Sequence, residues 1–241
     1  MAEPQVFPGG AGRSRARVAM KQTLLSWSSG KDSAWSLYVL QQQNDHEVVG
    51  LLTTFNRAAD RVAMHGVRRT LVEAQAKAAG IPLWDVDLPS PCSNADYEDI
   101  MGKTCKAAVL AGIECVAFGD LFLADIREYR EKQLKNSGLQ PIFPVWGMPT
   151  RELARSMINS GLRAKLACVD CQCLSAEFAG REFDEQLLSE LPPATDPCGE
   201  YGEFHSFVYA GPMFRHAVPV ELGEVVSRDR FVFADLILAD R

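Results

Sequence analysis

The sequence lacks any apolar run long enough to cross a membrane, and it lacks an excess of positive charge. A membrane-spanning helix needs about 20 mostly apolar residues, and no such run occurs in the 241 residues. The formal net charge is −6, whereas nucleic-acid-binding domains usually present a basic face. The N-terminal residues also lack the apolar core of a secretory signal. These absences predict a cytoplasmic protein with no membrane anchor and argue against a nucleic-acid partner.

The cysteines do not form the even, loop-spaced set of a disulfide framework. There are seven of them, an odd number, so reduced thiols are expected. The run CVDCQC brings together Cys168, Cys171 and Cys173, and Cys198 lies further on. A C-x-x-C pair can bind zinc or an iron–sulfur cluster, but a second pair at suitable spacing is missing. We therefore expect no metal here and keep a metal site as the alternative.

The composition is that of a globular protein with a sizeable core. Hydrophobic residues make up 47% and charged residues 23% of the chain, which is ordinary for a soluble fold. Residues 1–20 are rich in Gly, Pro and Arg and are predicted to be a disordered leader. We place a first domain at 21–145 and a smaller C-terminal domain at 146–241.

The first domain alternates between short apolar runs and helical periods. Strands are expected at TLLSWS, EVVGLLTTF, PLWDVDL and ECVAFGD, and amphipathic helices lie between them, ending near Gly80 and Gly112. Repetition of strand and helix predicts an α/β fold, a Rossmann-like parallel sheet with helices on both faces.

Beyond residue 120 the rhythm changes. Asp125 and Glu128 are spaced as a capping box for a helix that ends at Gly138, and Thr150 is expected to cap another helix. After a proline-rich stretch, EFHSFVYAGPMF and RFVFADLIL alternate as antiparallel strands do. The chain therefore closes with a smaller α+β part.

The turn SSGKDS, Ser28 to Ser33, is the first candidate binding site. It follows the first strand and opens a helix, and ligands of parallel sheets bind at the carboxyl ends of the strands. Backbone N–H groups and the helix dipole favour an anion there. Lys31 would add a cation, and Ser28 and Ser33 would offer hydroxyl groups. The turn does not fit the Walker A pattern, and a plain strand–helix connection is the alternative.

The turn resembles the Ser-Gly-Gly-x-Asp-Ser loop of the ATP pyrophosphatases, with Ser29 in place of the first glycine. Serine suits that position unless φ must be positive. A second block, CGEYGEFHSFVYAGPMF, is similar to the Gly-Glu-Asn-Gly-Glu-Phe-His-Thr-Phe signature of the diphthine–ammonia ligase family. FGDLFLADIREYRE and FPVWGMPTRELA also resemble that family, so the likeness spans residues 21–214. Tyr201 and Ser206 depart from the family's asparagine and threonine.

The resemblance implies an enzyme that uses ATP and Mg²⁺ to adenylate a carboxylate, releases pyrophosphate, and forms an amide with ammonia. It places ATP on Ser28, Ser29, Gly30, Lys31, Asp32 and Ser33. Asp32 would orient the loop or hold Mg²⁺, and its alternative role is to accept local N–H bonds. Asp120, at the end of the fourth strand, is a second carboxylate candidate. Arg127 and Arg130 would offset negative charge, although exposed helical arginines usually form solvated ion pairs.

Glu200, Glu203 and His205 are the candidates in the C-terminal part. Ammonia is mostly protonated near neutral pH, so a carboxylate can bind ammonium and a base must take its proton. In a strand, Glu203 and His205 would share one face. His205 is otherwise a satisfied histidine at a strand edge, and His65 is as suited to a loop role as to a ligand contact.

Two other functions stay open from the sequence. A tRNA-modifying sulfurtransferase would use the CVDCQC cysteines, and a regulatory module would bind ATP without turnover. For the ligase the family name implies diphthine on elongation factor 2, but Tyr201 leaves room for another small or protein-borne carboxylate. A homo-oligomer is compatible with the sequence.

Overall fold

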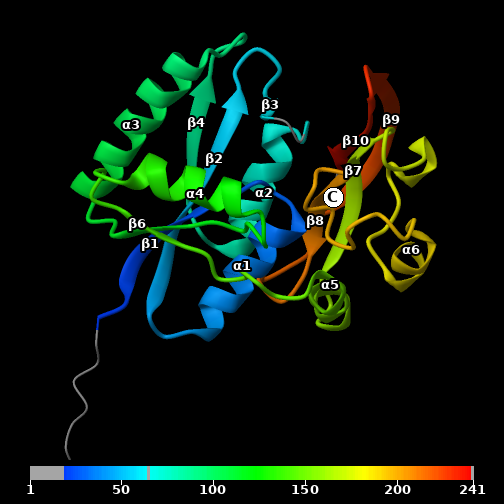
Figure 1. Ribbon diagram of the computed structural model, residues 1–241, viewed down its shortest axis with the longest axis horizontal. Helices are drawn as coiled ribbons and strands as arrows, with labels where there is room; N and C mark the ends of the chain where they lie inside the picture. Colours follow the sequence, from blue (N-terminus) through cyan, green and yellow to red (C-terminus); the bar gives the residue numbers. More distant parts are fainter. Residues whose placement is uncertain (1–18, 64–65, 240–241) are drawn as a thin grey trace, which may run out of the picture.

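We describe the chain from a computed structural model, in which residues 19–63 and 66–239 are described. The predicted leader lies almost entirely outside these residues, as does His65. The described part contains two sheets (Figure 1). No helix in it is long and apolar enough to span a bilayer.

Sheet A is mostly parallel and carries its helices on both faces, as predicted. Its strands are β1 (Lys21–Ser26), β2 (His46–Asn56), the short antiparallel β3 (Arg61–Val62), β4 (Leu83–Leu88), β5 (Cys115–Ala117) and β6 (Gln140–Ile142). The order is β4-β2-β1-β5-β6, and β3 extends the β1 edge of β2. The connecting helices are α1 (Lys31–Gln42), α2 (Arg69–Ala79), α3 (Asn94–Leu110) and α4 (Ala124–Leu134).

Alternation along the central strands divides the core between the two faces. Leu25 and Leu51 pack with α1 and α2 in one cluster, whereas Leu24 and Leu52 pack with residues of α3 and α4 in another. Because successive strand residues point to opposite faces, these neighbouring leucines require a helical layer on each side. The predicted doubly covered sheet is confirmed.

Sheet B is antiparallel and forms the second part of the molecule (Figure 1). Its order is β8 (Phe204–Ala210), β7 (Arg163–Asp170), β10 (Phe231–Leu238) and β9 (Val220–Arg228). Helix α5 (Thr150–Asn159) leads into it, and a 3₁₀ turn, η1 (Ala176–Phe178), and α6 (Glu185–Glu190) follow β7. Strand β8 contacts α1, so sheet B lies against the start of the first helix.

Two predicted helix caps are wrong. Helix α4 begins after Leu123 without a side-chain cap and ends at Leu134 rather than Gly138, and Asp125 lies inside its first turn. The capping box is on α3 instead, between Ser93 and Asp96. Thr150 is the first residue of α5, not its cap, because its hydroxyl group donates to Asp196. The Thr150 side chain, which local spacing assigned to the helix cap, forms a tertiary hydrogen bond instead.

Candidate functional site

The strand order places the candidate site at the centre of sheet A. The chain leaves β1 toward β2 on one side and enters β5 and β6 on the other, so the order reverses between β1 and β5. Ligands of open α/β sheets bind at such a reversal, beyond the carboxyl ends of the strands. The turn Ser28–Ser33 follows β1 there, and Asp120 follows β5. Asp120 and every residue of the turn except the buried Ser29 line one cleft of about 220 Å³.

Gly119 allows β5 to end directly against the turn. A Cβ atom at this position would lie 2.9 Å from the carbonyl carbon of Asp32 and 3.0 Å from the backbone nitrogen of Ser33. Real Cβ atoms do not approach backbone that closely, so only glycine fits without a shift. The glycine therefore sets the narrow spacing between the start of α1, which carries Asp32, and the end of β5, which Asp120 follows.

The backbone of the turn is strained at Ser29. Its φ is +69°. A positive φ was the one condition under which serine was expected not to suit this position. The residue is fully buried and its hydroxyl oxygen has no hydrogen-bond partner. Its carbonyl oxygen accepts from Val208 N on β8 at 3.0 Å and from Gln75 Nε2 on α2 at 3.0 Å. Neighbouring elements thus hold the turn in a conformation that serine disfavours.

Lys31 joins the turn to the C-terminal loop. Its side chain is buried, its Nζ donates to Asp32 Oδ2 at 2.8 Å and to the Cys198 carbonyl oxygen, and the rings of Phe183 and Phe204 lie beside it. Burial lowers the pKa of Lys31, but the nearby Asp32 and Cys198 outweigh it, and the pKa is raised. The ammonium group is therefore held charged between the turn and the C-terminal loop.

Asp32 and Asp120 each keep a carboxylate oxygen that accepts no hydrogen bond. Asp32 Oδ1 and Asp120 Oδ2 are buried and accept no hydrogen bond. Arg130 Nε on α4 lies 3.5 Å from Asp120 Oδ2, a distance at which the charges attract without a good hydrogen bond. Burial raises the pKa of both carboxyl groups, against the effect of Lys31 on Asp32 and of Arg130 on Asp120. The cleft thus contains carboxylate oxygens that lack a full set of partners.

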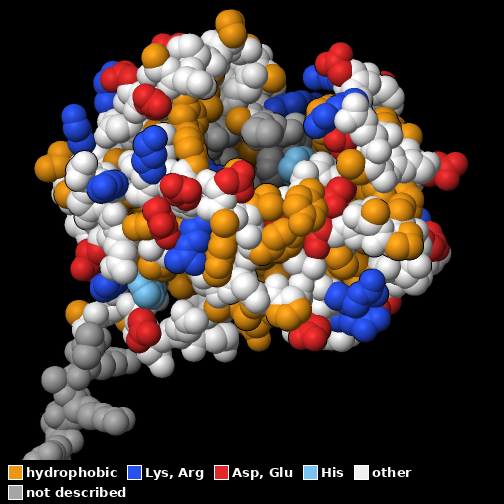
Figure 2. Space-filling view, viewed as in Figure 1, with side chains coloured by type: hydrophobic (Ala, Val, Ile, Leu, Met, Phe, Trp, Pro, Cys, Tyr) orange, Lys and Arg blue, Asp and Glu red, His pale blue; other side chains and the backbone are white. Residues whose placement is uncertain are grey.

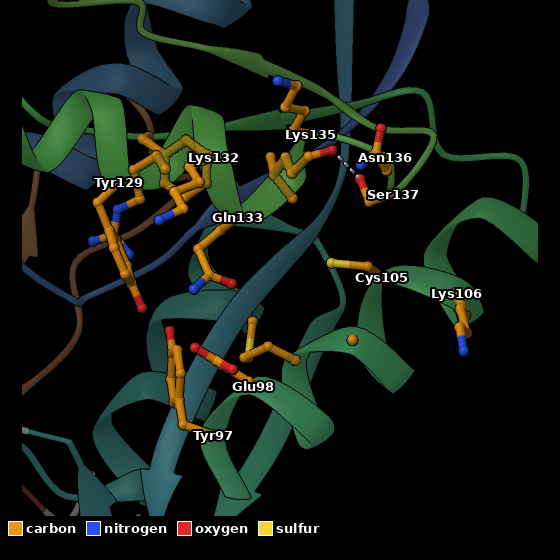
Figure 3. Close-up of a pocket in the computed structure, with 15 residues that line it drawn as sticks. Tyr97, Glu98, Cys105, Lys106, Tyr129, Lys132, Gln133, Lys135, Asn136 and Ser137 are labelled. Carbon is orange, nitrogen blue, oxygen red and sulfur yellow. Dashed lines mark hydrogen bonds between the residues drawn. The ribbon is translucent and has the colours of Figure 1, made fainter. Parts of the chain in front are cut away.

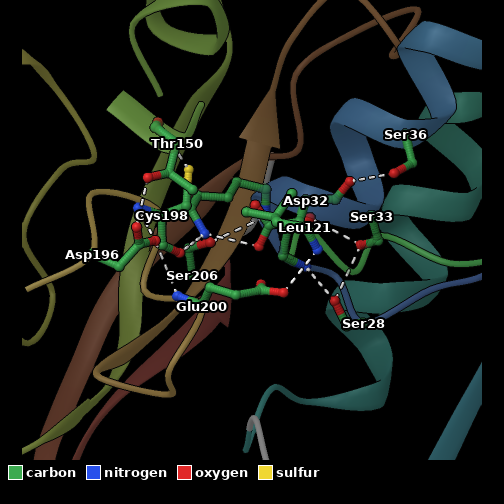
Figure 4. A network of polar contacts seen from close by, with 12 residues as sticks. Ser28, Asp32, Ser33, Ser36, Leu121, Thr150, Asp196, Cys198, Glu200 and Ser206 are labelled. Atoms are coloured by element: carbon green, nitrogen blue, oxygen red, sulfur yellow. Dashed lines mark hydrogen bonds and ion pairs between the residues drawn. The ribbon is translucent and has the colours of Figure 1, made fainter. Parts of the chain in front are cut away.

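Glu200 reaches the same cleft from the loop before β8. Its Oε1 accepts from Leu121 N at 2.7 Å, which ties the loop to the segment after β5 (Figure 4). Burial raises the pKa of Glu200 to about 7, against the backbone hydrogen bond from Leu121. A carboxyl group with this pKa can exchange a proton near neutral pH.

The loop that presents Glu200 is held by Asp196. Its Oδ1 accepts from Cys198 N at 2.9 Å and from Glu200 N at 3.3 Å, and its Oδ2 accepts from the Thr150 hydroxyl group at 2.6 Å. Glu203 also holds this loop, because its Oε1 accepts from Asp196 N at 2.8 Å. It is buried and does not line the cleft, so Glu203 and His205 do not meet there as expected.

His205 and Ser206 line the cleft from β8. Burial lowers the pKa of His205 to about 4, and nearby Lys31 adds to that effect, so the imidazole is neutral at pH 7. The Ser206 hydroxyl oxygen accepts from Lys31 N at 3.1 Å. Tyr201 points to the exterior, 68% exposed, with its ring against Phe122.

Of the remaining candidates, Arg130 reaches the cleft, and Arg127 and the cysteines do not line it. Arg130 lines the cleft, but Arg127 pairs with Glu131 and stacks on Phe143 and Trp146. Cys168 and Cys198 are buried, Cys171 and Cys173 are exposed, and all are free thiols. Within residues 19–63 and 66–239, no three His, Cys, Asp or Glu side chains are grouped as metal ligands.

Sequence reasoning missed Gln75 and Asp196. Gln75 is fully buried: its Oε1 accepts from Trp27 Nε1, and its Nε2 donates to the Ser29 and Val208 carbonyl oxygens. It follows Leu71 by four residues on the apolar face of α2, and a polar residue at that position was the available signal. Asp196 stood in a proline-rich stretch and carried no such signal.

Two family models match the chain. The diphthamide synthase N-terminal domain matches residues 20–141, and the diphthamide synthase C-terminal domain matches residues 149–235. A diphthine–ammonia ligase of Bos taurus is 25% identical over 230 residues, covering 86% of this chain and 85% of its own length. One of Danio rerio is 26% identical over 231 residues and covers 86% and 89%. The two family models together cover most of both sheets. The chain belongs to the diphthamide synthase family.

Proposed function

We propose that the chain is an ATP-dependent, AMP-forming ligase that converts a carboxylate into an amide with ammonia, as the names of its relatives suggest. One observation carries the proposal. The turn Ser28–Ser33 and the loop of Glu200, which are remote in sequence, meet in one cleft at the reversal of strand order. The first is suited to bind phosphate and the second to accept a proton.

The chemical groups of the cleft suit the triphosphate of ATP and a bound Mg²⁺ ion. The start of α1 brings the positive end of a helix dipole to the turn. Asp32 Oδ1 and Asp120 Oδ2 are buried oxygens that accept no hydrogen bond, although Asp120 pairs with Arg130. Carboxylate oxygen is the ligand that Mg²⁺ prefers. Bound Mg²⁺ would neutralise phosphate charge, and Asp32 and Asp120 would hold it.

The chemistry then has two steps. In the first, the substrate carboxylate attacks the α-phosphorus of ATP, the bond to the β-phosphate breaks, and pyrophosphate leaves. In the second, ammonia attacks the acyl carbon and AMP leaves. Ammonium must lose a proton before it attacks, and Glu200, with a pKa of about 7, accepts it. His205, with its pKa lowered to about 4, stays neutral and adds no positive charge to the cleft.

Pyrophosphate release tests the proposal. The full chain is incubated with ATP, Mg²⁺ and ammonium, with diphthine-bearing elongation factor 2 and small apolar carboxylic acids added in turn, and pyrophosphate and AMP are measured. We expect release that depends on the carboxylate substrate and that Asp32→Ala abolishes, whereas the exposed-site control Asp99→Ala retains it. ATP binding without pyrophosphate would contradict the ligase and favour a regulatory module.

A pH profile tests Glu200 separately. At a constant ammonium concentration, the rate of amide formation should rise with pH through about 7 as Glu200 loses its proton. Glu200→Gln should lower the rate by about 10²–10⁴-fold and remove this rise. Glu131→Gln, on the exposed face of α4, is the matched control. An unchanged profile in Glu200→Gln would remove Glu200 from this role.

A further inference from the structure

A second pocket adjoins the cleft and has no part in the function described so far. It lies between α3 and α4, on the opposite face of sheet A from α1, and has a volume of about 360 Å³ (Figure 3). Phe118 and Arg130 line both this pocket and the cleft of the turn. The two spaces therefore share one wall, and Arg130 belongs to that wall.

The chemistry of the lining favours an organic anion. Four cationic residues line the pocket, Lys106, Arg130, Lys132 and Lys135, against the single carboxylate of Glu98. This balance contrasts with the net charge of −6 of the whole chain. An anion is therefore attracted to this part of an otherwise acidic protein.

Aromatic and apolar groups provide the rest of the lining. The hydroxyl groups of Tyr97 on α3 and Tyr129 on α4 point toward one another (Figure 3). Met101 lies one turn further along α3. Arg130 stacks on Phe118, with its guanidinium carbon 5.1 Å from the ring centroid. Apolar walls with a few polar groups are typical of a small-molecule pocket.

Gly102 leaves room at the pocket. It lies in the middle of α3, where glycine costs about 1 kcal/mol relative to alanine, and it lines the pocket. A Cβ atom here would meet nothing within 4 Å. Backbone packing therefore does not require this glycine.

Arg130 connects the pocket to the reacting groups. Its Nε is buried without a hydrogen bond and lies 3.5 Å from Asp120 Oδ2, which also lacks one. An arginine binds a carboxylate through a planar pair of donors. A carboxylate that meets Arg130 from the pocket would therefore lie at the wall of the cleft in which the turn Ser28–Ser33 binds phosphate.

We propose that the pocket between α3 and α4 binds the carboxylate substrate, with an apolar or aromatic body among Tyr97, Met101 and Tyr129 and its carboxylate at Arg130. This inference rests on the proposed ligase function and adds to it the class of acid: one with an apolar body small enough for this pocket. In this arrangement Arg130 positions the substrate carboxylate, whereas an arginine on an exposed helix would only form a solvated ion pair.

Binding without ATP tests the pocket independently of catalysis. The probe is 3-phenylpropionate at millimolar concentration, compared with 3-phenylpropionamide, and binding to the full chain is followed by ligand-observed NMR. We expect the acid to bind at least about tenfold more tightly than the amide. Gly102→Leu should fill the pocket and abolish binding, and Arg130→Gln should remove the preference for the acid. Ala107→Leu, exposed on the same helix and outside the pocket, should bind as the wild type does.

The outcomes separate this inference from the proposed function. Equal binding of acid and amide, no binding of either, or retained binding in Gly102→Leu would overturn the pocket. ATP affinity, titrated in the same variants, should not change in Gly102→Leu. If ATP affinity falls instead, the pocket belongs to the nucleotide and the inference is wrong. Acid binding in the pocket without pyrophosphate release would contradict the ligase alone.

Discussion

Single residues of the site are held in conformations and charge states that cost stability. Ser29 is the plainest case, because its φ of +69° and its partnerless hydroxyl group are both unfavourable in a buried position. Ser29→Gly should raise the free energy of unfolding by about 1–2 kcal/mol, since glycine adopts positive φ without a Cβ clash. Urea denaturation followed by circular dichroism measures the change.

Two variants separate the causes of this gain. Ser29→Ala removes the hydroxyl group but keeps the strain, so it should recover only part of the stability. Asp229→Gly, at a φ of +52° in the exposed turn between β9 and β10, should gain less than Ser29→Gly, because aspartate tolerates that region. A loss of stability in Ser29→Gly would mean that the serine side chain contributes a contact that outweighs the strain.

Glu200 should make stability depend on pH. Its pKa is about 7 in the folded chain, against an ordinary value of 4.5. Between these values the folded state binds more protons than the unfolded state, so the free energy of unfolding falls as pH rises. Glu200→Gln lacks this titration. The free energy of unfolding of Glu200→Gln, relative to that of the wild type, should therefore rise by on the order of 1–2 kcal/mol between pH 5 and pH 8, after discounting for partial exposure.

The comparison is made by urea denaturation at each pH. Glu131→Gln, whose carboxylate is half exposed on α4, should show no comparable trend. If the difference between wild type and Glu200→Gln stays constant across this range, Glu200 titrates at an ordinary pKa and is not suited to accept a proton near neutral pH.

At the scale of elements, Gln75 holds together α2, the end of β1 and β8. Gln75→Ala would leave Trp27 Nε1 and the Val208 carbonyl oxygen buried without these bonds. Each lost partner costs about 1–3 kcal/mol, so we expect a loss of about 2–5 kcal/mol in the free energy of unfolding, measured in urea. Glu73→Ala, exposed on the same helix, should change it little. A small effect of Gln75→Ala would show that the three elements pack without this side chain.

The alternation of elements in sheet A was readable from the sequence, and parts of sheet B were not. Buried strands and amphipathic helices carry strong periodic signals, and glycines marked the ends of α2 and α3. β3 has only two residues. β7 contains small residues and the first cysteine of CVDCQC, a run that suggested a ligand motif. β9 is mostly exposed, with Gly223 in its interior. Such strands are fixed by their partners rather than by their own pattern.

The site shows the same division between local and tertiary information. Asp32, Asp120, Glu200 and His205 were predicted from residue chemistry, and the structure brings all four to one cleft. Glu203 was predicted beside them, but its carboxylate accepts a backbone hydrogen bond from Asp196. Which acidic side chain enters the cleft and which one braces the loop depends on tertiary hydrogen bonds that the spacing of residues does not encode.

At the scale of the whole molecule, one apolar core joins the two sheets. A single cluster contains Leu25 and Phe55 of sheet A and Leu166, Phe204 and Phe207 of sheet B. Ion pairs add a second connection, because Asp235 on β10 accepts hydrogen bonds from Arg61 of β3 and from Arg68, the residue before α2. The candidate site lies where the two parts meet, so its geometry depends on their staying together.

We therefore predict that the chain unfolds as one cooperative unit. All four tryptophans, Trp27, Trp35, Trp84 and Trp146, precede sheet B. Tryptophan fluorescence therefore reports on the chain before sheet B, whereas far-ultraviolet circular dichroism reports on the whole chain. Because the shared core would be cut open if either part unfolded alone, the two urea transitions should coincide. Residues 19–145 expressed alone should lack a cooperative transition, since the face of α1 and α2 that packs on sheet B would be exposed. Two separate transitions in the full chain would show instead that the core between the sheets is weaker than the core within each.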